Sequence, residues 1–172
     1  MLLKVMKGYL KNEKATNEMI KDGNWLHTGD IAYYDESQRF YIVDRLKELI
    51  KVNAFQVAPA ELEDLIRSHI DVKDAAVIGI PDKMKGEVPL AFIVTNDKNK
   101  DKELVKESVH RFVNEHVSVY KQLCGGIQIV ESIPRSVSGK ILRKDLKALI
   151  VTAKENKRIY GTLEKYEQGH ER

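Results

Sequence analysis

The stretch Trp25-Leu-His-Thr-Gly-Asp30, followed fourteen residues later by Asp44-Arg-Leu-Lys-Glu-Leu-Ile-Lys51, is the most informative part of this chain. A carboxylate at the end of a tight Thr-Gly-Asp turn can accept two hydrogen bonds from a ribose diol. Arg45 and Lys51 carry cationic groups that can meet a phosphate or a carboxylate. The spacing of these groups predicts a nucleotide site. Other segments must contribute to it, because neither motif can hold ATP alone.

The residues between the two motifs are expected to form a β-hairpin. Residues 31–34 and 39–43 are rich in side chains that favour strands, and the turn-forming residues 35–38 separate them. Upstream, Asp22-Gly23-Asn24 marks a further turn. The first part of the chain is therefore predicted to end in two paired strands.

Three helices are expected downstream of the second motif. The first begins at Pro59, because proline suits the first turn of a helix; the second includes residues 104–113, and the third begins at residue 143. Each is predicted to turn one set of side chains inward at helical spacing. These inward residues are Leu62, Leu65, Ile66 and His69; then Leu104, Val105, Ser108, Val109, Phe112 and Val113; and finally Leu146, Leu149 and Ile150.

Three buried strands are expected in the same part of the chain. Residues 75–80 and 88–95 are apolar runs bounded by turn-forming residues, and residues 126–130 form a third such run. The predicted fold class is therefore α+β, with a small mixed three-stranded sheet, helices, and a preceding β-hairpin. From residue 152 onward charged residues outnumber apolar ones, which predicts a frayed helix or a disordered tail.

The bulk properties set limits on the class of protein. A chain of 172 residues with 42% hydrophobic and 32% charged residues is typical of one globular domain plus a flank. A net charge of +3 is too small to indicate a nucleic acid partner. No apolar run is long enough for a transmembrane helix or a signal peptide. Cys124 is the single cysteine, which excludes an internal disulfide and favours a reducing compartment, and it is interpreted as a small packing residue.

Three motifs agree in order and spacing with those of a known family. They are Thr28-Gly-Asp30; Asp44-Arg-Leu-Lys47 with Gln56-Val-Ala-Pro59; and Pro134-Arg-Ser-Val-Ser-Gly-Lys140. On these motifs the chain resembles the C-terminal part of an acyl-adenylate-forming (AMP-binding) enzyme of the 4-coumarate-CoA ligase and beetle luciferase branch. The resemblance implies that residues 1–44 are a remnant of a large N-terminal AMP-binding domain, that residues 45–150 are its mobile lid domain, and that residues 151–172 are a charged tail.

The resemblance assigns the adenylation step to Lys140. This residue matches the family's lysine that reaches the substrate carboxylate and the α-phosphate while charge builds during displacement of pyrophosphate. A cation placed where charge develops lowers the barrier more than it strengthens ground-state binding. Without the resemblance, a solvated surface lysine is the more common interpretation.

Asp30 and Arg45 match the positions that bind the ATP ribose, the first through its carboxylate and the second through its guanidinium. Alternatively, Asp30 caps a turn, and Arg45 pairs with Asp44 or Glu48 at the surface. His27 has no partners that would orient it as a base, so a structural role is expected.

The resemblance places a second set of residues in thioester formation. Lys51 and Gln56 match residues that contact the acyl-adenylate or frame the thiol channel. Most relatives have Lys-Gly where this chain has Asn53-Ala54, so a cation is absent and a methyl group narrows the path for coenzyme A. Lys47 matches the hinge about which the lid rotates.

The complete enzyme implied by the resemblance is an ATP-dependent carboxylate–CoA ligase. It uses ATP, Mg²⁺ bound mainly by the N-terminal domain, a carboxylic acid and coenzyme A. The chain lacks most of that domain, so we expect it to be inactive alone and to require an N-terminal AMP-binding domain as partner. The alternatives are a truncated non-catalytic interaction module and the lid of a luciferase-like monooxygenase. Localisation is expected to be peroxisomal, by family analogy, or cytoplasmic, although the chain ends in His170-Glu-Arg172 rather than in a Ser-Lys-Leu signal.

Overall fold

The computed structural model describes residues 5–21 and 25–150. The chain divides after Lys47 into two compact units, and each unit is described by itself below. Among the described residues, no helix is both long enough and apolar enough to span a bilayer. The expected charged tail at 151–172 lies outside the described residues.

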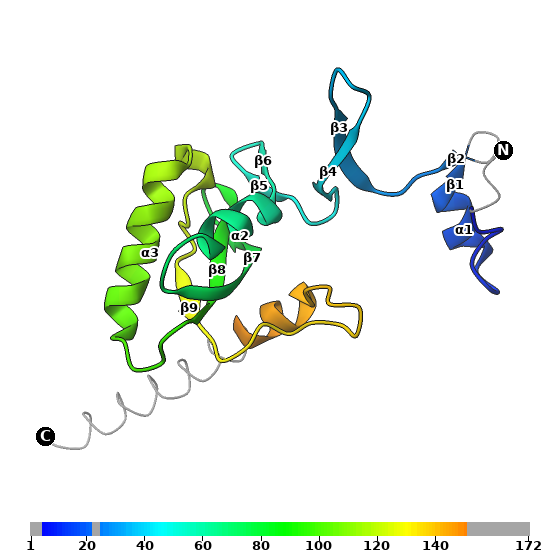
Figure 1. The fold of residues 1–172 in the computed structure, drawn as a ribbon. Coiled ribbons are helices and arrows are strands. Elements are labelled where there is room, and N and C mark those ends of the chain that lie inside the picture. Colours follow the sequence, from blue (N-terminus) through cyan, green and yellow to red (C-terminus); the bar gives the residue numbers. More distant parts are fainter. Residues whose placement is uncertain (1–4, 22–24, 151–172) are drawn as a thin grey trace, which may run out of the picture. The chain divides into compact units, whose positions relative to one another are not determined.

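The first unit holds short elements and the expected hairpin (Figure 1). Helix α1 covers Glu13–Met19, and β1 (Ile20–Lys21) pairs antiparallel with β2 (Trp25–Leu26). Strands β3 (Asp30–Tyr34) and β4 (Phe40–Arg45) form the second antiparallel pair, which confirms the predicted hairpin. The sequence pattern did not predict α1, β1 or β2, because each is too short to display a hydrophobic period.

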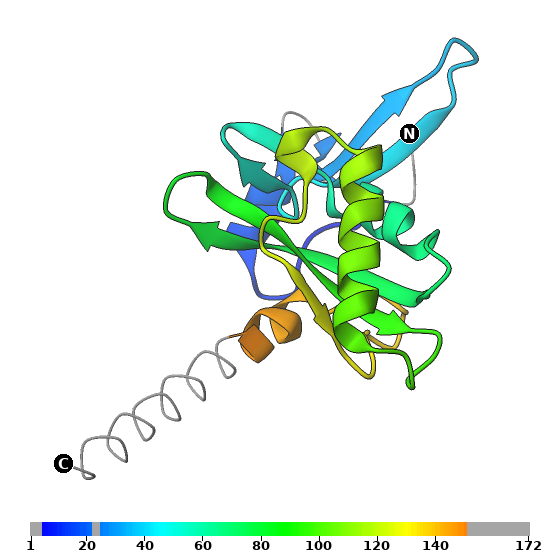
Figure 2. The ribbon, with the colours of Figure 1, turned by 90° about the vertical axis from the view of Figure 1, so that its left-hand side faces the viewer.

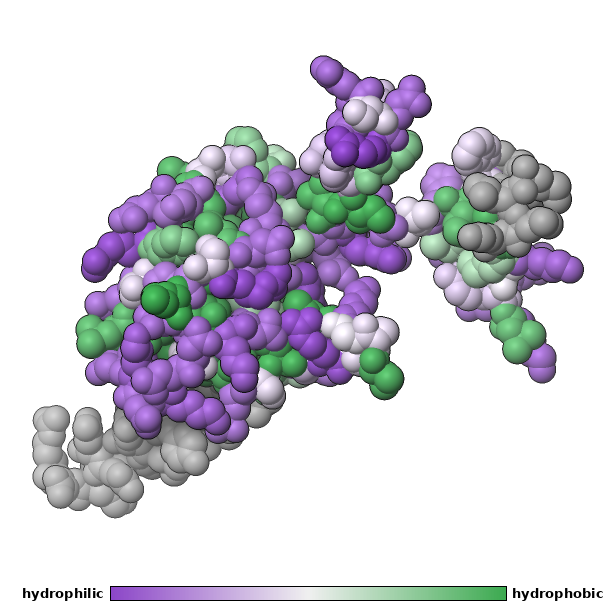
Figure 3. All heavy atoms as spheres, viewed as in Figure 1, coloured by the Kyte–Doolittle hydropathy of each residue, from purple (hydrophilic) through white to green (hydrophobic). Residues whose placement is uncertain are grey.

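The hairpin carries exposed hydrophobic side chains on both strands. These residues are Tyr33, Tyr34, Phe40, Tyr41, Ile42 and Val43. In Figure 3 the hairpin shows both hydrophobic (green) and hydrophilic (purple) residues. The rings of Tyr33 and Tyr41 stack across the strands with their centroids 5.0 Å apart.

The second unit is built on one five-stranded sheet, in the order β6-β5-β8-β7, with β9 also paired to β8. The β8–β9 pair is parallel and the other pairs are antiparallel, which confirms the mixed sheet. The strands are β5 (Ile50–Val52), β6 (Phe55–Val57), β7 (Val72–Asp82), β8 (Gly86–Thr95) and β9 (Ile127–Ile129). The three expected strands are β7, β8 and β9; β5 and β6, with three residues each, were not predicted as part of the sheet.

Helices cover both faces of this sheet. Helix α2 (Pro59–Arg67) and helix α3 (Lys102–His116) lie on one face, and residues 143–150 form a helix on the other. Figure 2 looks onto the face that α3 covers. A short 3₁₀ helix, η1 (Val119–Lys121), follows α3. The three expected helices are therefore present.

The core follows from the alternation of side chains along β7 and β8. Successive residues of a strand point to opposite faces. Ala75 and Val77 accordingly join the cluster under α2 and α3, whereas Ala76 and Ile78 join the cluster under residues 143–150. The helices contribute the following buried residues: Leu62 and Ile66 from α2; Val105, Val109 and Val113 from α3; and Leu146 from the last helix.

Three details of the predicted inward faces differ. His69 lies beyond the end of α2, which covers Pro59–Arg67. Leu104 is 65% exposed, because it lies at the outer edge of the stripe that α3 buries through Val105, Val109 and Val113. Leu149 is also exposed, at 50%.

Candidate functional site

The Thr-Gly-Asp turn and the end of β4 bring Asp30 and Arg45 together. The two residues are partners in the β3–β4 register, and Arg45 Nε lies 2.7 Å from Asp30 Oδ1. Gly29 has a φ of +72°, a left-handed conformation that favours glycine, and the Asp30 amide donates a hydrogen bond to Thr28 Oγ1 at 3.1 Å. The turn thus fixes the backbone that carries the Asp30 carboxylate.

The guanidinium of Arg45 pairs with Asp30 rather than with either acidic neighbour considered from the sequence. Asp44 is buried, and its Oδ1 instead accepts the Arg45 backbone N–H at 2.6 Å. The Arg45 side chain is 55% exposed and that of Asp30 is 20% exposed. A pair with a half-exposed guanidinium contributes little to stability. The Arg45 guanidinium is the more accessible of the two groups to a ligand.

Lys140 lies on a tight loop that is fixed from two sides. The amide of Ser136 donates to the Lys140 carbonyl oxygen at 2.8 Å, and Gly139 closes the turn at a φ of +82°. Arg135 donates to the Gly139 carbonyl oxygen and also pairs with both carboxylate oxygens of Asp74 on β7, each at 2.9 Å. The backbone that carries Lys140 is therefore anchored to the central sheet.

The side chain of Lys140 belongs to a group of two basic and two acidic residues in the second unit. Lys140 Nζ lies 3.4 Å from Glu48 Oε1, and Arg143 Nε lies 3.2 Å from Glu48 Oε2. Arg143 Nη2 in turn lies 2.9 Å from Glu63 Oε1, which also accepts the N–H of Val77 at 2.9 Å. We call Lys140, Glu48, Arg143 and Glu63 the ion ladder.

Lys51 and Gln56 lie opposite each other on β5 and β6. They are cross-strand partners in the register, and both are exposed. Side chains of directly paired residues in an antiparallel pair point to the same face. The β5–β6 hairpin therefore presents Lys51 and Gln56, the two residues predicted for the thioester step, side by side. The Lys51 amide donates to Glu87 Oε2 at 2.9 Å, which ties the hairpin to β8.

The two residues between β5 and β6 make an unusual turn. Asn53 has a φ of 46° and Ala54 a φ of 68°, the pattern of a two-residue hairpin turn that prefers Asn-Gly. Asparagine tolerates this conformation, whereas alanine pays a steric cost of about 1–2 kcal/mol. Ala54, where most relatives have glycine, therefore introduces backbone strain as well as the methyl group expected from the sequence.

An aromatic stack joins the β5–β6 hairpin to the 3₁₀ helix η1. The rings of Phe55 and Tyr120 are 4.5 Å apart between centroids and nearly parallel. Next to them, the Lys121 ammonium pairs with both carboxylate oxygens of Glu61 at 2.6 and 2.8 Å. Phe55 thus packs against Tyr120, although it is 53% exposed.

Sequence reasoning missed Glu48, Glu63 and Arg143. Glu63 lies past the first turn of α2 and is 4% exposed. A signal was present: Glu63 falls on the buried stripe of α2 with Leu62 and Ile66. A carboxylate at such a position requires a partner.

The other residues considered from the sequence are Lys47, His27 and Cys124, and all three are exposed. Lys47 is exposed and is the last residue of the first unit. His27 is exposed, and its backbone N–H donates to the Met19 carbonyl oxygen. Cys124 is exposed, with Lys85 Nζ 3.4 Å from its sulfur, so the interpretation as a packing residue is wrong.

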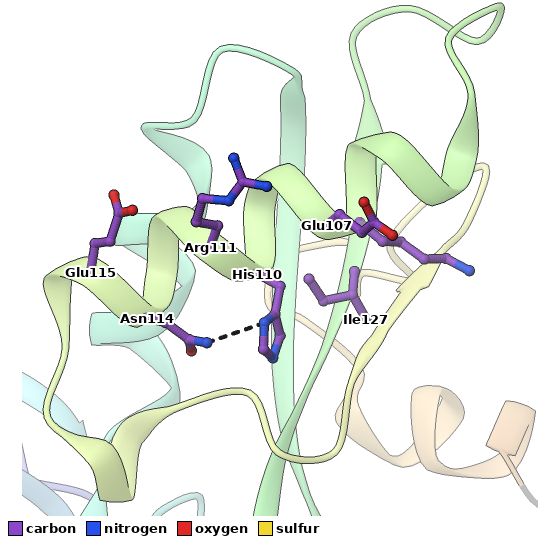
Figure 4. Close-up of a pocket in the computed structure, with 7 residues that line it drawn as sticks. Glu107, His110, Arg111, Asn114, Glu115 and Ile127 are labelled. Atoms are coloured by element: carbon purple, nitrogen blue, oxygen red, sulfur yellow. Dashed lines mark hydrogen bonds between the residues drawn. The ribbon is translucent and has the colours of Figure 1, made fainter.

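A hollow of about 610 Å³ along α3 contains none of these residues (Figure 4). It is lined by Lys106, Glu107, His110, Arg111, Asn114, Glu115 and Ile127. Within the described part of the chain, no three His, Cys, Asp or Glu side chains gather closely enough to hold a metal ion.

A family model and individual relatives both match this chain to one family of enzymes. Residues 61–140 match the family described as AMP-binding enzyme C-terminal domain. The chain is 52% identical over 144 residues to 4-coumarate–CoA ligase 1 of Arabidopsis thaliana, covering 84% of this chain and 25% of that protein. It is 46% identical over 149 residues to 4-coumarate–CoA ligase 1 of Glycine max, covering 87% and 50% respectively.

Solved structures agree with the sequence relatives. The structure of o-succinylbenzoate-CoA synthetase from Bacillus subtilis, in complex with its acyl-adenylate intermediate, aligns with a TM-score of 0.72 at 34% identity and covers 83% of this chain and 28% of that one. The chain thus spans a quarter to a half of the length of the curated relatives compared here.

Proposed function

From the premise that this chain belongs to the AMP-binding enzymes through their C-terminal domain, we propose that it serves as the catalytic lid of an ATP-dependent carboxylate–CoA ligase. In the first step a substrate carboxylate oxygen attacks the α-phosphorus of ATP, the bond to the β-phosphate breaks, and pyrophosphate leaves. In the second step the thiol of coenzyme A attacks the acyl carbonyl and AMP leaves. The acid is selected by the N-terminal domain.

The observation that carries this proposal is the placement of Lys140. The backbone of its loop is held by Arg135 and Gly139, whereas its side chain is 58% exposed and carries the ammonium group at the end of a flexible stem. A cation on a flexible side chain, carried by a fixed backbone, is suited to meeting negative charge that develops on the carboxylate and the α-phosphate. Lys140 is the catalytic residue of the first step in this account.

Asp30 and Arg45 serve the nucleotide. The Asp30 carboxylate accepts hydrogen bonds from the ribose hydroxyls, and the Arg45 guanidinium contributes a second polar contact. Their register pairing and the accessibility of the Arg45 guanidinium support this role. Magnesium accompanies ATP in such enzymes; since the described residues offer no cluster that suits it, no step here depends on this chain holding the metal.

Lys51 and Gln56 serve the second step. After adenylation the lid rotates about Lys47 and presents the β5–β6 hairpin in place of the Lys140 loop, as in domain closures that assemble a site in stages. Lys51 contacts the acyl-adenylate, and the turn at Asn53 and Ala54 borders the path of the thiol. The cross-strand pairing of Lys51 with Gln56 supports a shared role.

A chimeric enzyme tests this function. The full chain replaces the matching C-terminal segment of the Arabidopsis ligase, and pyrophosphate release is measured with 4-coumarate and ATP. We expect activity that Lys140→Ala abolishes and that Lys147→Ala, an exposed lysine on the last helix, leaves unchanged. A chimera that folds but releases no pyrophosphate with Lys140 intact would contradict the proposal and favour a non-catalytic interaction module.

A further inference from the structure

We propose that Glu48 is a positioning residue for adenylate formation, acting through Lys140. Its carboxylate joins the ammonium of Lys140 to the guanidinium of Arg143, at 3.4 and 3.2 Å. This inference rests on the proposed catalytic role of Lys140. Glu48 itself does not touch substrate.

The inner end of the ion ladder is rigid. Glu63 is 4% exposed and accepts a hydrogen bond from the backbone of Val77, in the centre of β7. The Arg143 side chain, 16% exposed, pairs with Glu63 at 2.9 Å. The buried Glu63 carboxylate, paired with Arg143 and hydrogen-bonded to Val77, has few alternative positions. Arg143 Nε makes no hydrogen bond within the described part of the chain, so Arg143 supports the Glu48 carboxylate through charge alone.

The outer end of the ladder is loose. The Lys140–Glu48 separation of 3.4 Å exceeds the 2.9 Å of the inner pair, and Lys140 is 58% exposed. An ion pair in such a wet environment is worth little. Lys140 can therefore leave Glu48 for a substrate at small cost, and Arg143 still balances the Glu48 charge after it leaves.

The place of Glu48 in the chain adds a second argument. Glu48 is the first residue of the second unit and follows Lys47 directly, whereas Lys140 lies far downstream on the loop anchored to Asp74. The ladder thus joins the catalytic loop to the segment that adjoins the proposed hinge. Glu48 keeps the lysine on that side of the unit and restricts the orientations that its four-carbon stem would otherwise sample.

Conservative variants of the chimeric enzyme test this role. Because the exposed Lys140–Glu48 pair is weak, the loss of orientation in Glu48→Gln is expected to lower kcat for adenylate formation by about three- to fivefold. The KM for ATP and the conversion of preformed acyl-adenylate to thioester are expected to stay within about twofold. Glu48→Asp, which retains the charge, is expected to recover part of the loss. Glu103→Gln is the matched control, since Glu103 also pairs with a lysine, Lys106 at 2.7 Å.

A double variant separates failure of this inference from failure of the proposed function. If Glu48 acts through Lys140, Glu48→Gln causes no further loss in a Lys140→Ala background. An adenylation rate unaffected by Lys140→Ala would overturn the proposed function itself. If Lys140→Ala abolishes adenylation while Glu48→Gln leaves it unchanged, or if Glu48→Gln slows both half-reactions equally, only the positioning role is overturned. Thermal melting of each variant shows whether a loss reflects unfolding, and Glu48→Asp supplies the test if Glu48→Gln does not fold.

Discussion

Replacing Ala54 by glycine is expected to stabilise the second unit. The φ of 68° at Ala54 lies in the left-handed region, where a Cβ costs about 1–2 kcal/mol. Glycine removes this cost but loses about 0.5–1 kcal/mol of chain entropy on folding. The difference is a gain of about 0.5–1 kcal/mol, which for a unit of this size raises Tm by about 2–6 °C.

Thermal unfolding of the full chain, followed by circular dichroism, measures this change. Asn53→Gly is the matched control at the neighbouring position, where φ is 46°, and a much smaller gain is expected because asparagine tolerates this conformation. In the chimeric enzyme, Ala54→Gly is also expected to speed thioester formation, since it removes the methyl group beside the proposed thiol path. A Tm that falls, or that rises no more than in Asn53→Gly, would refute the reasoning about strain.

Three further predictions concern other parts of the chain. Arg143→Met removes the guanidinium that pairs with the buried Glu63 carboxylate and is expected to cost roughly 3 kcal/mol in the free energy of unfolding, measured with urea; a cost below about 1 kcal/mol would show that the inner pair is not structural. Gly139→Ala meets no atom within 4 Å but must adopt a φ of +82°, so a loss of about 1 kcal/mol with slower adenylation is expected, and an unchanged Tm would contradict it. The pKa of Asp35 lies below its usual value, chiefly because the Arg39 amide donates to its carboxylate, so the β3–β4 turn is expected to be fully stable above the unfolded pKa of Asp35 and to loosen as the pH falls through the lowered folded value. Amide exchange of Arg39 measures this change, and Asp35→Asn should abolish the pH dependence.

Much of the fold could be predicted because long elements display their period. The stripe that α3 buries recurs every four residues through Val105, Val109 and Val113, and the apolar runs of β7 and β8 have the length of buried strands. Strands β5 and β6 could not be recognised as part of the sheet. Each has three residues, and their turn uses alanine where glycine would have marked a hairpin.

The candidate site was predicted in part. The motifs indicated Asp30, Arg45 and Lys140 as single residues, but only the register and the loop geometry reveal their partners. Glu48 and Arg143 pair across a long stretch of sequence, and such long-range contacts leave no local pattern. Sequence spacing therefore identified the residues that meet the substrate more readily than those that hold them in place.

The most direct test of the central claim compares the two half-reactions in Lys140→Ala and Lys51→Ala forms of the chimeric enzyme. We expect Lys140→Ala to slow adenylate formation by about 100-fold or more and largely to spare thioester formation from preformed adenylate. We expect the opposite selectivity for Lys51→Ala. Equal losses in both half-reactions for either variant would contradict a lid that uses one set of residues for each step.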